Sequence, residues 1–317
     1  MELVALAGGV GAGKLLRGLQ RLAFDEGHGL TVIVNTADDI ELWGLHVSPD
    51  LDSVVYWLAG GMDRERGWGR GDETFRVRDE LEAQNMLPTW FALGDRDLAT
   101  HLYRTELLRE GWTLTAAAAA VVEAFELPWT VLPMSDDPVT TMVQIQEPDA
   151  LRHDVHFQEY WVRRGAEPPV RAVRFEGAIR ARPAPGVLEA IRTADAVVIC
   201  PSNPVVSIGP ILAVPGIRDA LWERSDRVVG ISPIVGGTVL AGMADKLMPV
   251  VGLEVSALGA AKAYEGLLTG WVVDGADRDL APKIEERLGI RVAVTDTIMR
   301  DDRVTTELAR TALDLLR

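Results

Sequence analysis

Runs of consecutive apolar residues recur along the chain and alternate with segments of helical periodicity. The apolar runs lie at residues 3–7, 31–34, 196–200, 227–231, 271–274 and 292–295. Helical patterns cover residues 14–19, 186–192, 217–224, 257–267, 277–288 and 304–316. Because the apolar residues of each run are continuous rather than alternating, we expect strands that are covered on both faces. The pattern predicts an α/β fold with a three-layer, doubly wound core and a mainly parallel sheet.

Residues from about 60 to 190 follow a different pattern. Helical stretches at 75–84, 97–109 and 115–125 are followed by extended pieces of period-2 character at 140–146 and 155–162. No Pro- or Ser-rich linker sets this region apart. We therefore predict a single α/β domain over residues 1–317, with a mixed α+β subdomain inserted at 60–190.

Composition narrows the class of protein and its partners. The 317 residues are 48% hydrophobic, enough for a large core, and the net charge of −15 argues against nucleic acid and anionic membranes as partners. Cys200 is the single cysteine, which fits a reducing cytoplasm. The N-terminus has no basic region before an apolar one, and the apolar stretch 116–125 is too short to cross a bilayer. We expect a cytoplasmic protein without a signal peptide.

A glycine-rich turn, GGVGAGK at residues 8–14, follows the first apolar run. Backbone N–H groups at a strand-to-helix turn can bind an anion, so we predict phosphate or nucleotide contacts there. The spacing mimics a P-loop, but Leu15 stands where that motif needs Ser or Thr for magnesium. The alternative is a tight turn that only lets the helix and the strand pack.

Carboxylates follow the second apolar run, at Asp38 and Asp39, and a second acidic string holds Asp50 and Asp52. Both lie near the carboxyl ends of predicted strands, where open α/β sheets bind ligands. Oxygen ligands beside phosphates suit Mg²⁺, and a carboxylate there can also align or deprotonate a hydroxyl. We attribute Asp50 to helix capping. Asp52, with Asp38 or Asp39, is the predicted metal site.

Further polar turns are candidates for substrate contacts. Arg96 lies in a glycine turn that opens a helix and is a plausible clamp for a phosphate or carboxylate. Ser202 and Asn203 directly follow a strand and can hydrogen-bond a base, ribose or phosphate. Taken alone, His101 on that helix fits a structural histidine, and residues 133–138 fit a hairpin connection.

Eight strings in order resemble the 2-phospho-L-lactate transferase family, which makes the core of the deazaflavin coenzyme F-420. They are GGVG at 8–11, VNTADD at 34–39, SPDLD at 48–52, GDRDLATH at 94–101, PMSDDP at 133–138, HFQEYWV at 156–162, PSNPVVSIGP at 201–210 and SPI at 232–234. One such string would be weak, whereas eight in the family's order are specific.

The resemblance implies a transferase. The acceptor is FO, 7,8-didemethyl-8-hydroxy-5-deazariboflavin. Its terminal ribityl hydroxyl attacks the phosphorus that bears the lactyl group in a lactyl-diphosphoguanosine donor, and GMP leaves. Some bacterial members use the enolpyruvyl analogue of the donor. Mg²⁺ bridges the diphosphate, and a homodimer is implied.

The resemblance also implies roles for residues at the matching positions. Asp52 and Asp38 are catalytic, and Asp38, Asp39 and Asp52 hold the metal. The residues expected at FO are Asp52, Gly94, Arg96 and Ser135. The residues expected at the guanosine diphosphate part are Gly8, Gly9, Gly11, Gly13, Ser202 and Asn203.

Two other functions compete with the transferase. A non-catalytic, nucleotide-sugar-binding regulator of the gluconeogenesis-factor type shares the glycine turn and the fold. The strings at 94–101 and 156–162 favour the transferase, because a sensor needs no acceptor pocket. A P-loop kinase is disfavoured by Leu15.

Overall fold

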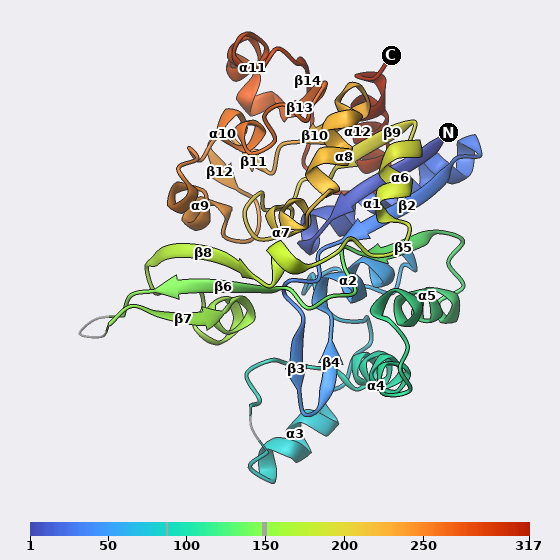
Figure 1. The fold of residues 1–317 in the computed structure, drawn as a ribbon, viewed down its shortest axis with the longest axis vertical. Helices are drawn as coiled ribbons and strands as arrows, with labels where there is room; N and C mark the ends of the chain where they lie inside the picture. Colours follow the sequence, from blue (N-terminus) through green and yellow to red (C-terminus); the bar gives the residue numbers. More distant parts are fainter. Residues whose placement is uncertain (87, 148–150) are drawn as a thin grey trace.

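In a computed structural model, which describes residues 1–86, 88–147 and 151–317, a seven-stranded parallel sheet forms the centre of the protein (Figure 1). Its strand order is β14-β13-β10-β9-β1-β2-β5, and every neighbouring pair is parallel. The strands are β1 (Glu2–Ala7), β2 (Gly29–Val34), β5 (Thr130–Pro133), β9 (Ala196–Ile199), β10 (Val228–Ile231), β13 (Gly270–Asp274) and β14 (Arg291–Thr295). The predicted α/β class and the six predicted strands are confirmed.

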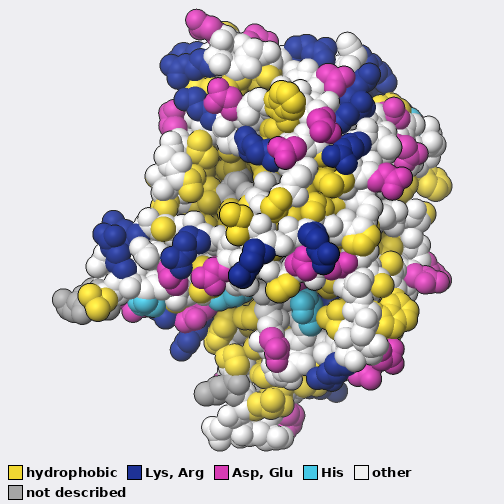
Figure 2. Space-filling view, in the orientation of Figure 1, with side chains coloured by type: hydrophobic (Ala, Val, Ile, Leu, Met, Phe, Trp, Pro, Cys, Tyr) yellow, Lys and Arg dark blue, Asp and Glu magenta, His cyan; other side chains and the backbone are white. Residues whose placement is uncertain are grey.

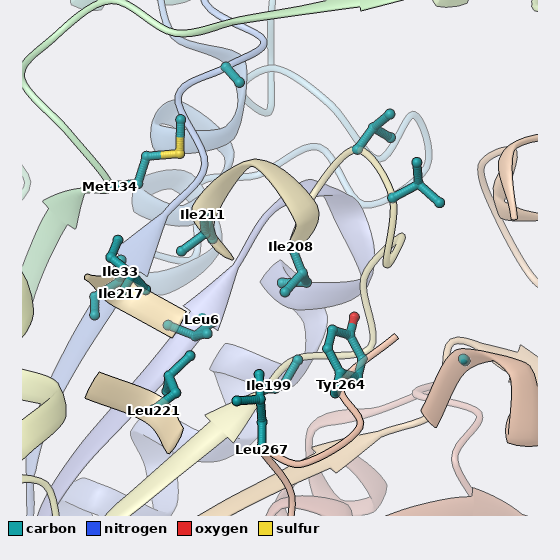
Figure 3. Close-up of a cluster of buried hydrophobic side chains, with 14 of the residues drawn as sticks. Leu6, Ile33, Met134, Ile199, Ile208, Ile211, Ile217, Leu221, Tyr264 and Leu267 are labelled. Atoms are coloured by element: carbon teal, nitrogen blue, oxygen red, sulfur yellow. The ribbon is translucent and has the colours of Figure 1, made fainter. Parts of the chain in front are cut away.

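Helices cover both faces of the sheet. Neighbouring residues of each strand point to opposite faces, so each strand contributes side chains to two buried clusters. In β1, Leu3 and Ala5 belong to one buried cluster, whereas Val4 and Leu6 belong to the other. The first cluster includes residues of α1 (Gly9–Glu26), α2 (Pro49–Leu58), α5 (Leu114–Ala124) and α12 (Asp302–Asp314). The second includes residues of α6 (Val187–Thr193), α7 (Gly209–Ala213), α8 (Ile217–Glu223) and α10 (Ala257–Lys262). Figure 3 shows the second cluster, where Leu6 and Ile199 face Ile208 and Leu221.

Smaller elements project from the core toward the lower part of Figure 1. An antiparallel sheet combines β6 (Thr140–Ile145), β7 (His153–His156) and β8 (Val170–Glu176), and a hairpin combines β3 (Ile40–Leu42) with β4 (Leu45–Val47). Two further helices in this part are α3 (Arg76–Ala83) and α4 (Asp95–Arg109). The extended piece predicted at 155–162 is wrong beyond β7, because Glu159–Arg163 form a π-helix.

The remaining elements are short or lie in the C-terminal part of the chain. They are β11 (Ile234–Val235), β12 (Thr238–Val239), α9 (Ala244–Leu247), α11 (Ala281–Leu288) and the 3₁₀ turns Ala178–Arg180, Ser225–Arg227, Pro249–Val251 and Gly275–Leu280. Within the ranges given above, no helix is both long and apolar enough to cross a membrane.

The range 60–190 contributes to the central sheet. Strand β5 lies inside this range and pairs with β2, from Thr31↔Thr130 to Val34↔Pro133. Helix α6 also begins inside it. The chain between β2 and β9 therefore builds both the smaller elements and one edge of the core.

Candidate functional site

The carboxyl ends of β1 and β9 meet where the sheet changes direction. From β1 the chain adds β2 and β5 on one side, and then returns to add β9, β10, β13 and β14 on the other. Open α/β sheets bind ligands in the crevice at such a point. Figure 2 shows a hollow with hydrophobic walls on this face, at the level of α7, which follows the loop after β9.

The four predicted glycines lie at this point, and each is required by a close approach or by backbone conformation. Gly9 has a φ of +71°, in the left-handed region. A Cβ at Gly11 would lie 2.1 Å from the carbonyl oxygen of Pro201, and one at Gly13 would lie 2.0 Å from the ring of Trp57. A Cβ at Gly8 would lie 2.9 Å from a carboxylate oxygen of Asp50. The turn therefore brings the loop after β9 and helix α2 against the start of α1.

Asp50 is the carboxylate that contacts the glycine turn. The backbone N–H of Gly9 donates to its Oδ1 over 2.8 Å, and the amide of Asn35 donates to its Oδ2 over 2.9 Å. The N-cap of α2 is Ser48, and Asp50 lies within the first helical turn. The capping role that we attributed to Asp50 is therefore wrong, because its carboxylate faces the ends of β1 and β2.

Asn35, which is fully buried at the end of β2, joins three segments. In addition to its bond to Asp50, its amide nitrogen lies 3.4 Å from the carbonyl oxygen of Val206, in the loop after β9. Its Oδ1 accepts from the N–H of Ala37 over 3.0 Å. The acidic turn after β2, the start of α2 and the loop after β9 are thus cross-linked by one side chain.

Asp38 and Asp39 lie in that acidic turn, and one oxygen of each carboxylate, Oδ1, is buried without a hydrogen-bond partner among the described residues. The other oxygen of Asp39 lies 3.0 Å from His46 Nε2. His156 Nδ1 accepts from the N–H of Gln158, so His156 Nε2 carries hydrogen and donates to the backbone oxygen of Asp39 over 3.1 Å. The three-stranded sheet of β6, β7 and β8 therefore contacts the acidic turn through His156 of β7.

Burial changes the titration of all three carboxyls. It raises the pKa of Asp50 to about 6, although hydrogen bonds from Asn35 and Gly9 oppose the rise. Burial, followed by repulsion from Asp50, raises the pKa of Asp38 well above its ordinary value. Burial also raises the pKa of Asp39, against the effect of His46. The strand ends thus hold three acidic groups that are costly to ionise without a cation.

This group fits a magnesium ion held partly by substrate. Within the residues that the structure describes, no three His, Cys, Asp or Glu side chains are placed to hold a metal ion by themselves. Mg²⁺ is commonly bound by one or two carboxylates together with phosphates and water. Asp38 and Asp50 are the carboxylates that fit, because both are buried and the charge of Asp50 raises the cost of ionising Asp38.

Asp52, predicted to hold the metal and to bind FO, lies in a different cluster. Its carboxylate forms a two-pronged ion pair with Arg104 of α4, with Nη1 at 3.1 Å from Oδ2 and a short contact from Nη2 to Oδ1. His101 Nδ1 lies 3.4 Å from the same Oδ2, and His101 Nε2 lies 3.5 Å from Asp97 Oδ1. Tyr56 donates to Asp97 over 2.6 Å. The structure therefore assigns Asp50 rather than Asp52 to the acidic group at the strand ends.

Two of the residues predicted to bind FO, Arg96 and Ser135, make hydrogen bonds within the protein. Arg96 is exposed and donates to the carbonyl oxygen of Gly71 over 3.1 Å. Ser135 donates to the carbonyl oxygen of Arg182 over 2.7 Å and accepts from the N–H of Asp137 over 2.9 Å. Both Ser135 bonds stabilise the turn after β5.

Gly94 is the N-cap of α4, and its lack of a side chain makes room for Glu73. A Cβ there would lie 1.8 Å from Glu73 Cγ. The Glu73 carboxylate accepts from the N–H groups of Arg96 and Asp97 over 2.5 and 3.2 Å. The anion position at the start of α4 is thus filled by a side chain of the protein itself.

Ser202 and Asn203 follow β9 as predicted, but they differ in availability. Asn203 Oδ1 accepts from the N–H of Val205 over 2.9 Å, which closes a turn. Ser202 Oγ is buried and has no hydrogen-bond partner among the described residues. The Ser202 hydroxyl therefore remains available to a ligand, whereas the Oδ1 of the half-exposed Asn203 is used within the turn.

Sequence reasoning missed Asn35, Asp50 and Arg104. The first two lie inside the strings at 34–39 and 48–52, so proximity to the predicted acids could have drawn attention to them. Arg104 lies just beyond the string at 94–101 and carries no signal of its own. Its role depends on how α4 packs against α2.

The chain is similar to known proteins over nearly its whole length. The family model described as 2-phospho-L-lactate transferase CofD matches residues 3–309. A protein of Streptomyces griseus subsp. griseus named phosphoenolpyruvate transferase is 50% identical, over 99% of this chain and 98% of its own length. Proteins of the same name from Thermobifida fusca and Mycolicibacterium smegmatis are 47% and 43% identical, each over 99% of this chain and 98% of their own.

Solved structures support the fold. A UPF0052-family protein from Bacillus halodurans superposes with a TM-score of 0.65 at 17% identity, covering 98% of each chain. At that identity the likeness concerns the fold alone. The family match extends over nearly the whole chain, and the chain belongs to the CofD family of 2-phospho-L-lactate transferases.

Proposed function

We propose that this transferase moves an enolpyruvyl phosphate group, or its 2-phospholactyl analogue, from a diphosphoguanosine donor to the ribityl hydroxyl of FO, releasing GMP in coenzyme F-420 biosynthesis. The relatives named phosphoenolpyruvate transferase, which match over 98% of their length, favour the enolpyruvyl donor. The observation that carries the proposal is a group of three carboxyls at the point where the sheet changes direction: Asp38 and Asp50, which are buried, and Asp39, whose side chain is 12% exposed.

The donor diphosphate lies between the start of α1 and the loop after β9. The first N–H groups of a helix attract anions, and Gly8, the N-cap residue of α1, has no side chain that could cap them. The Gly9 N–H is used by Asp50, so the following N–H groups are the ones that face the diphosphate. Ser202 Oγ supplies a neutral hydrogen bond from the other side. A diphosphate here stands beside Asp50, and the repulsion between them has to be neutralised.

Asp38 and Asp50 are the residues that would hold Mg²⁺, which would supply positive charge beside the diphosphate and the leaving GMP. The burial of both carboxyls supports this role, because their ionised forms gain most from a bound cation.

The ribityl oxygen bonds to the phosphorus that bears the enolpyruvyl group, the bond from that phosphorus to the bridging oxygen breaks, and GMP leaves with this oxygen. The hydroxyl proton passes to Asp39 Oδ1, which is buried and unpartnered among the described residues. His46, on the other oxygen of Asp39 and one-third exposed, can relay it to solvent.

The magnesium requirement, a cytoplasmic location and a homodimer are further parts of the proposal. The charge of −15 and the single cysteine support a reducing compartment and small-molecule partners, FO and the donor, rather than nucleic acid. The homodimer rests on the family resemblance.

Mass spectrometry of the product tests the proposal. The purified protein is incubated with FO, Mg²⁺ and either the lactyl or the enolpyruvyl donor, with Asp50→Asn as a parallel variant. We expect an FO adduct that carries the donor's phosphate-linked group, with GMP in equal amount, and faster turnover of the enolpyruvyl donor. Absence of an adduct with both donors would contradict the proposed substrates.

A further inference from the structure

Arg104 occupies the centre of the contacts between α4 and the two acidic segments. Its side chain is 1% exposed and points away from solvent. One guanidinium nitrogen, Nη1, donates both to Asp52 of α2 over 3.1 Å and to the backbone oxygen of His46 in β4 over 3.3 Å. The second nitrogen, Nη2, contacts the other oxygen of Asp52. One planar group thus joins α4 to both α2 and β4.

The contact with Asp52 fixes the rotation of α2. Asp50 and Asp52 are two residues apart in the first turn of this helix, so their side chains point about 200° apart around its axis. Asp50 faces Gly9 and Asn35, whereas Asp52 faces Arg104. A rotation of α2 that loosened Asp52 would also turn Asp50 away from the glycine turn.

The contact with His46 fixes the acidic turn from the opposite side. The backbone N–H of His46 donates to Thr105 Oγ1 over 2.8 Å, while its carbonyl oxygen accepts from Arg104. Arg104 and Thr105, which are consecutive in α4, therefore bond the carbonyl oxygen and the N–H of His46. The His46 ring in turn lies 3.0 Å from the Asp39 carboxylate.

We propose that Arg104 is a positioning residue that aligns Asp50, through Asp52, and Asp39, through His46, for the transfer reaction. The functional part of this inference rests on the proposed function of Asp39 and Asp50, whereas the alignment itself can be measured without turnover. If Arg104 only neutralised Asp52, removal of both charges together would restore a native site. An arginine is needed for alignment because its fork reaches both elements at once.

The test compares Arg104→Gln, the double variant Asp52→Asn with Arg104→Gln, and a control double variant, Arg192→Gln with Glu223→Gln. The control removes an ion pair of 3.1 Å between α6 and α8, which bring no residue to the site. Arg104→Gln alone leaves the buried Asp52 carboxylate without its guanidinium partner and can fail to fold. The double variant avoids this, because it removes both buried charges.

Two measurements are made on each variant: hydrogen exchange of the segment 36–52 by mass spectrometry, and kcat and KM for transfer to FO. In the double variant we expect this segment to exchange at least about tenfold faster than in wild type, while β13 and β14 are unchanged. We expect kcat to fall by about ten- to a hundredfold, with KM for the donor changed less. The control variant should match wild type in both.

Wild-type exchange of the segment 36–52 in the double variant overturns the inference, whatever its kcat. Faster exchange with an unchanged kcat overturns the functional part, because the alignment would not matter for transfer. If wild type transfers nothing to FO, the proposed function fails, and the exchange data still decide whether Arg104 orders the acidic segments.

Discussion

The backbone nitrogen of Gly9 donates a hydrogen bond to Asp50 Oδ1 over 2.8 Å, which joins the first residue of α1 to the first turn of α2. Gly9 lies in the turn where the sequence predicts phosphate contacts, so one of the expected donors is used by a side chain of the protein. A diphosphate at this turn stands beside a carboxylate and needs a cation between them. Asp50 is therefore the carboxylate whose loss should affect transfer most.

Asp50→Asn should nearly abolish transfer in a protein that remains folded. The amide keeps the shape of the side chain but loses the charge that holds Mg²⁺, and it loses one hydrogen bond, from Gly9 or from Asn35, worth about 1 kcal/mol. We expect kcat/KM to fall by about a hundredfold or more at saturating Mg²⁺. A wild-type kcat/KM in this variant would remove Asp50 from the site.

Asp52→Asn should act mainly on stability. It leaves the guanidinium of Arg104 buried without a charged partner, which costs about 3–5 kcal/mol. Urea unfolding of Asp52→Asn and Asp50→Asn at the same pH measures the difference. Equal stability of Asp52→Asn and wild type would mean that the ion pair is not buried in solution.

The stability of the metal-free protein should fall as the pH rises through about 6, because the pKa of Asp50 is raised from 3.8 to about 6. A carboxyl with a raised folded-state pKa stabilises the fold below its unfolded pKa, and this contribution is lost as the pH rises through the folded value. For Asp50 the difference corresponds to about 3 kcal/mol at most. Asp50→Asn lacks this pH-dependent contribution. The free energy of unfolding of the variant minus that of wild type should therefore become more positive between pH 4 and 7.

Urea unfolding in EDTA at several pH values checks this prediction, and Mg²⁺ provides the control. The ion binds the ionised carboxylates, so it should stabilise wild type more at pH 7.5 than at pH 5, and Asp50→Asn much less. Parallel pH profiles of the two proteins in EDTA would show that Asp50 ionises normally.

Gly11→Ala should disturb the junction between α1 and the loop after β9. The added Cβ would lie 2.1 Å from the backbone oxygen of Pro201, which cannot move aside as a side-chain end can. We expect a loss of about 1–3 kcal/mol in stability and weaker guanine nucleotide binding in calorimetry. Gly275→Ala is the control, because no atom lies within 4 Å of a Cβ at that position. Normal nucleotide affinity of Gly11→Ala would contradict a ligand site at this junction.

The sheet could be predicted because its strands are buried on both faces and therefore read as continuous apolar runs. Strand β5 was missed because it ends at Pro133, which reads as the start of a turn. Strand β8 was missed for another reason. It is half-exposed and carries Arg171 and Arg174 among its apolar residues, so its pattern is polar.

The acidic character of the site could be predicted, but the choice between Asp50 and Asp52 could not. Both lie in one string, and the helix turns them to opposite sides. Which side faces the strand ends depends on how α2 packs against α4, through an ion pair between residues that are 52 positions apart. No local pattern reports such a contact. The contact of Ser135 could not be predicted either, because its hydroxyl donates to the carbonyl oxygen of Arg182, 47 positions away.

Ser135 and Ser202 give a matched pair of serine-to-alanine variants with opposite expected effects. Ser135 Oγ makes two hydrogen bonds within the protein, so Ser135→Ala should lose about 1–2 kcal/mol of stability, while KM for FO and for the donor stays unchanged. Ser202 Oγ is buried and has no partner among the described residues, so Ser202→Ala should cost no stability. If this hydroxyl bonds the donor, its removal should weaken guanine nucleotide binding by about three- to tenfold, which corresponds to one neutral hydrogen bond. Urea unfolding and calorimetric titration with GDP and Mg²⁺ separate the two effects. A loss of stability in Ser202→Ala with unchanged nucleotide affinity would place this hydroxyl in the protein interior rather than at the donor.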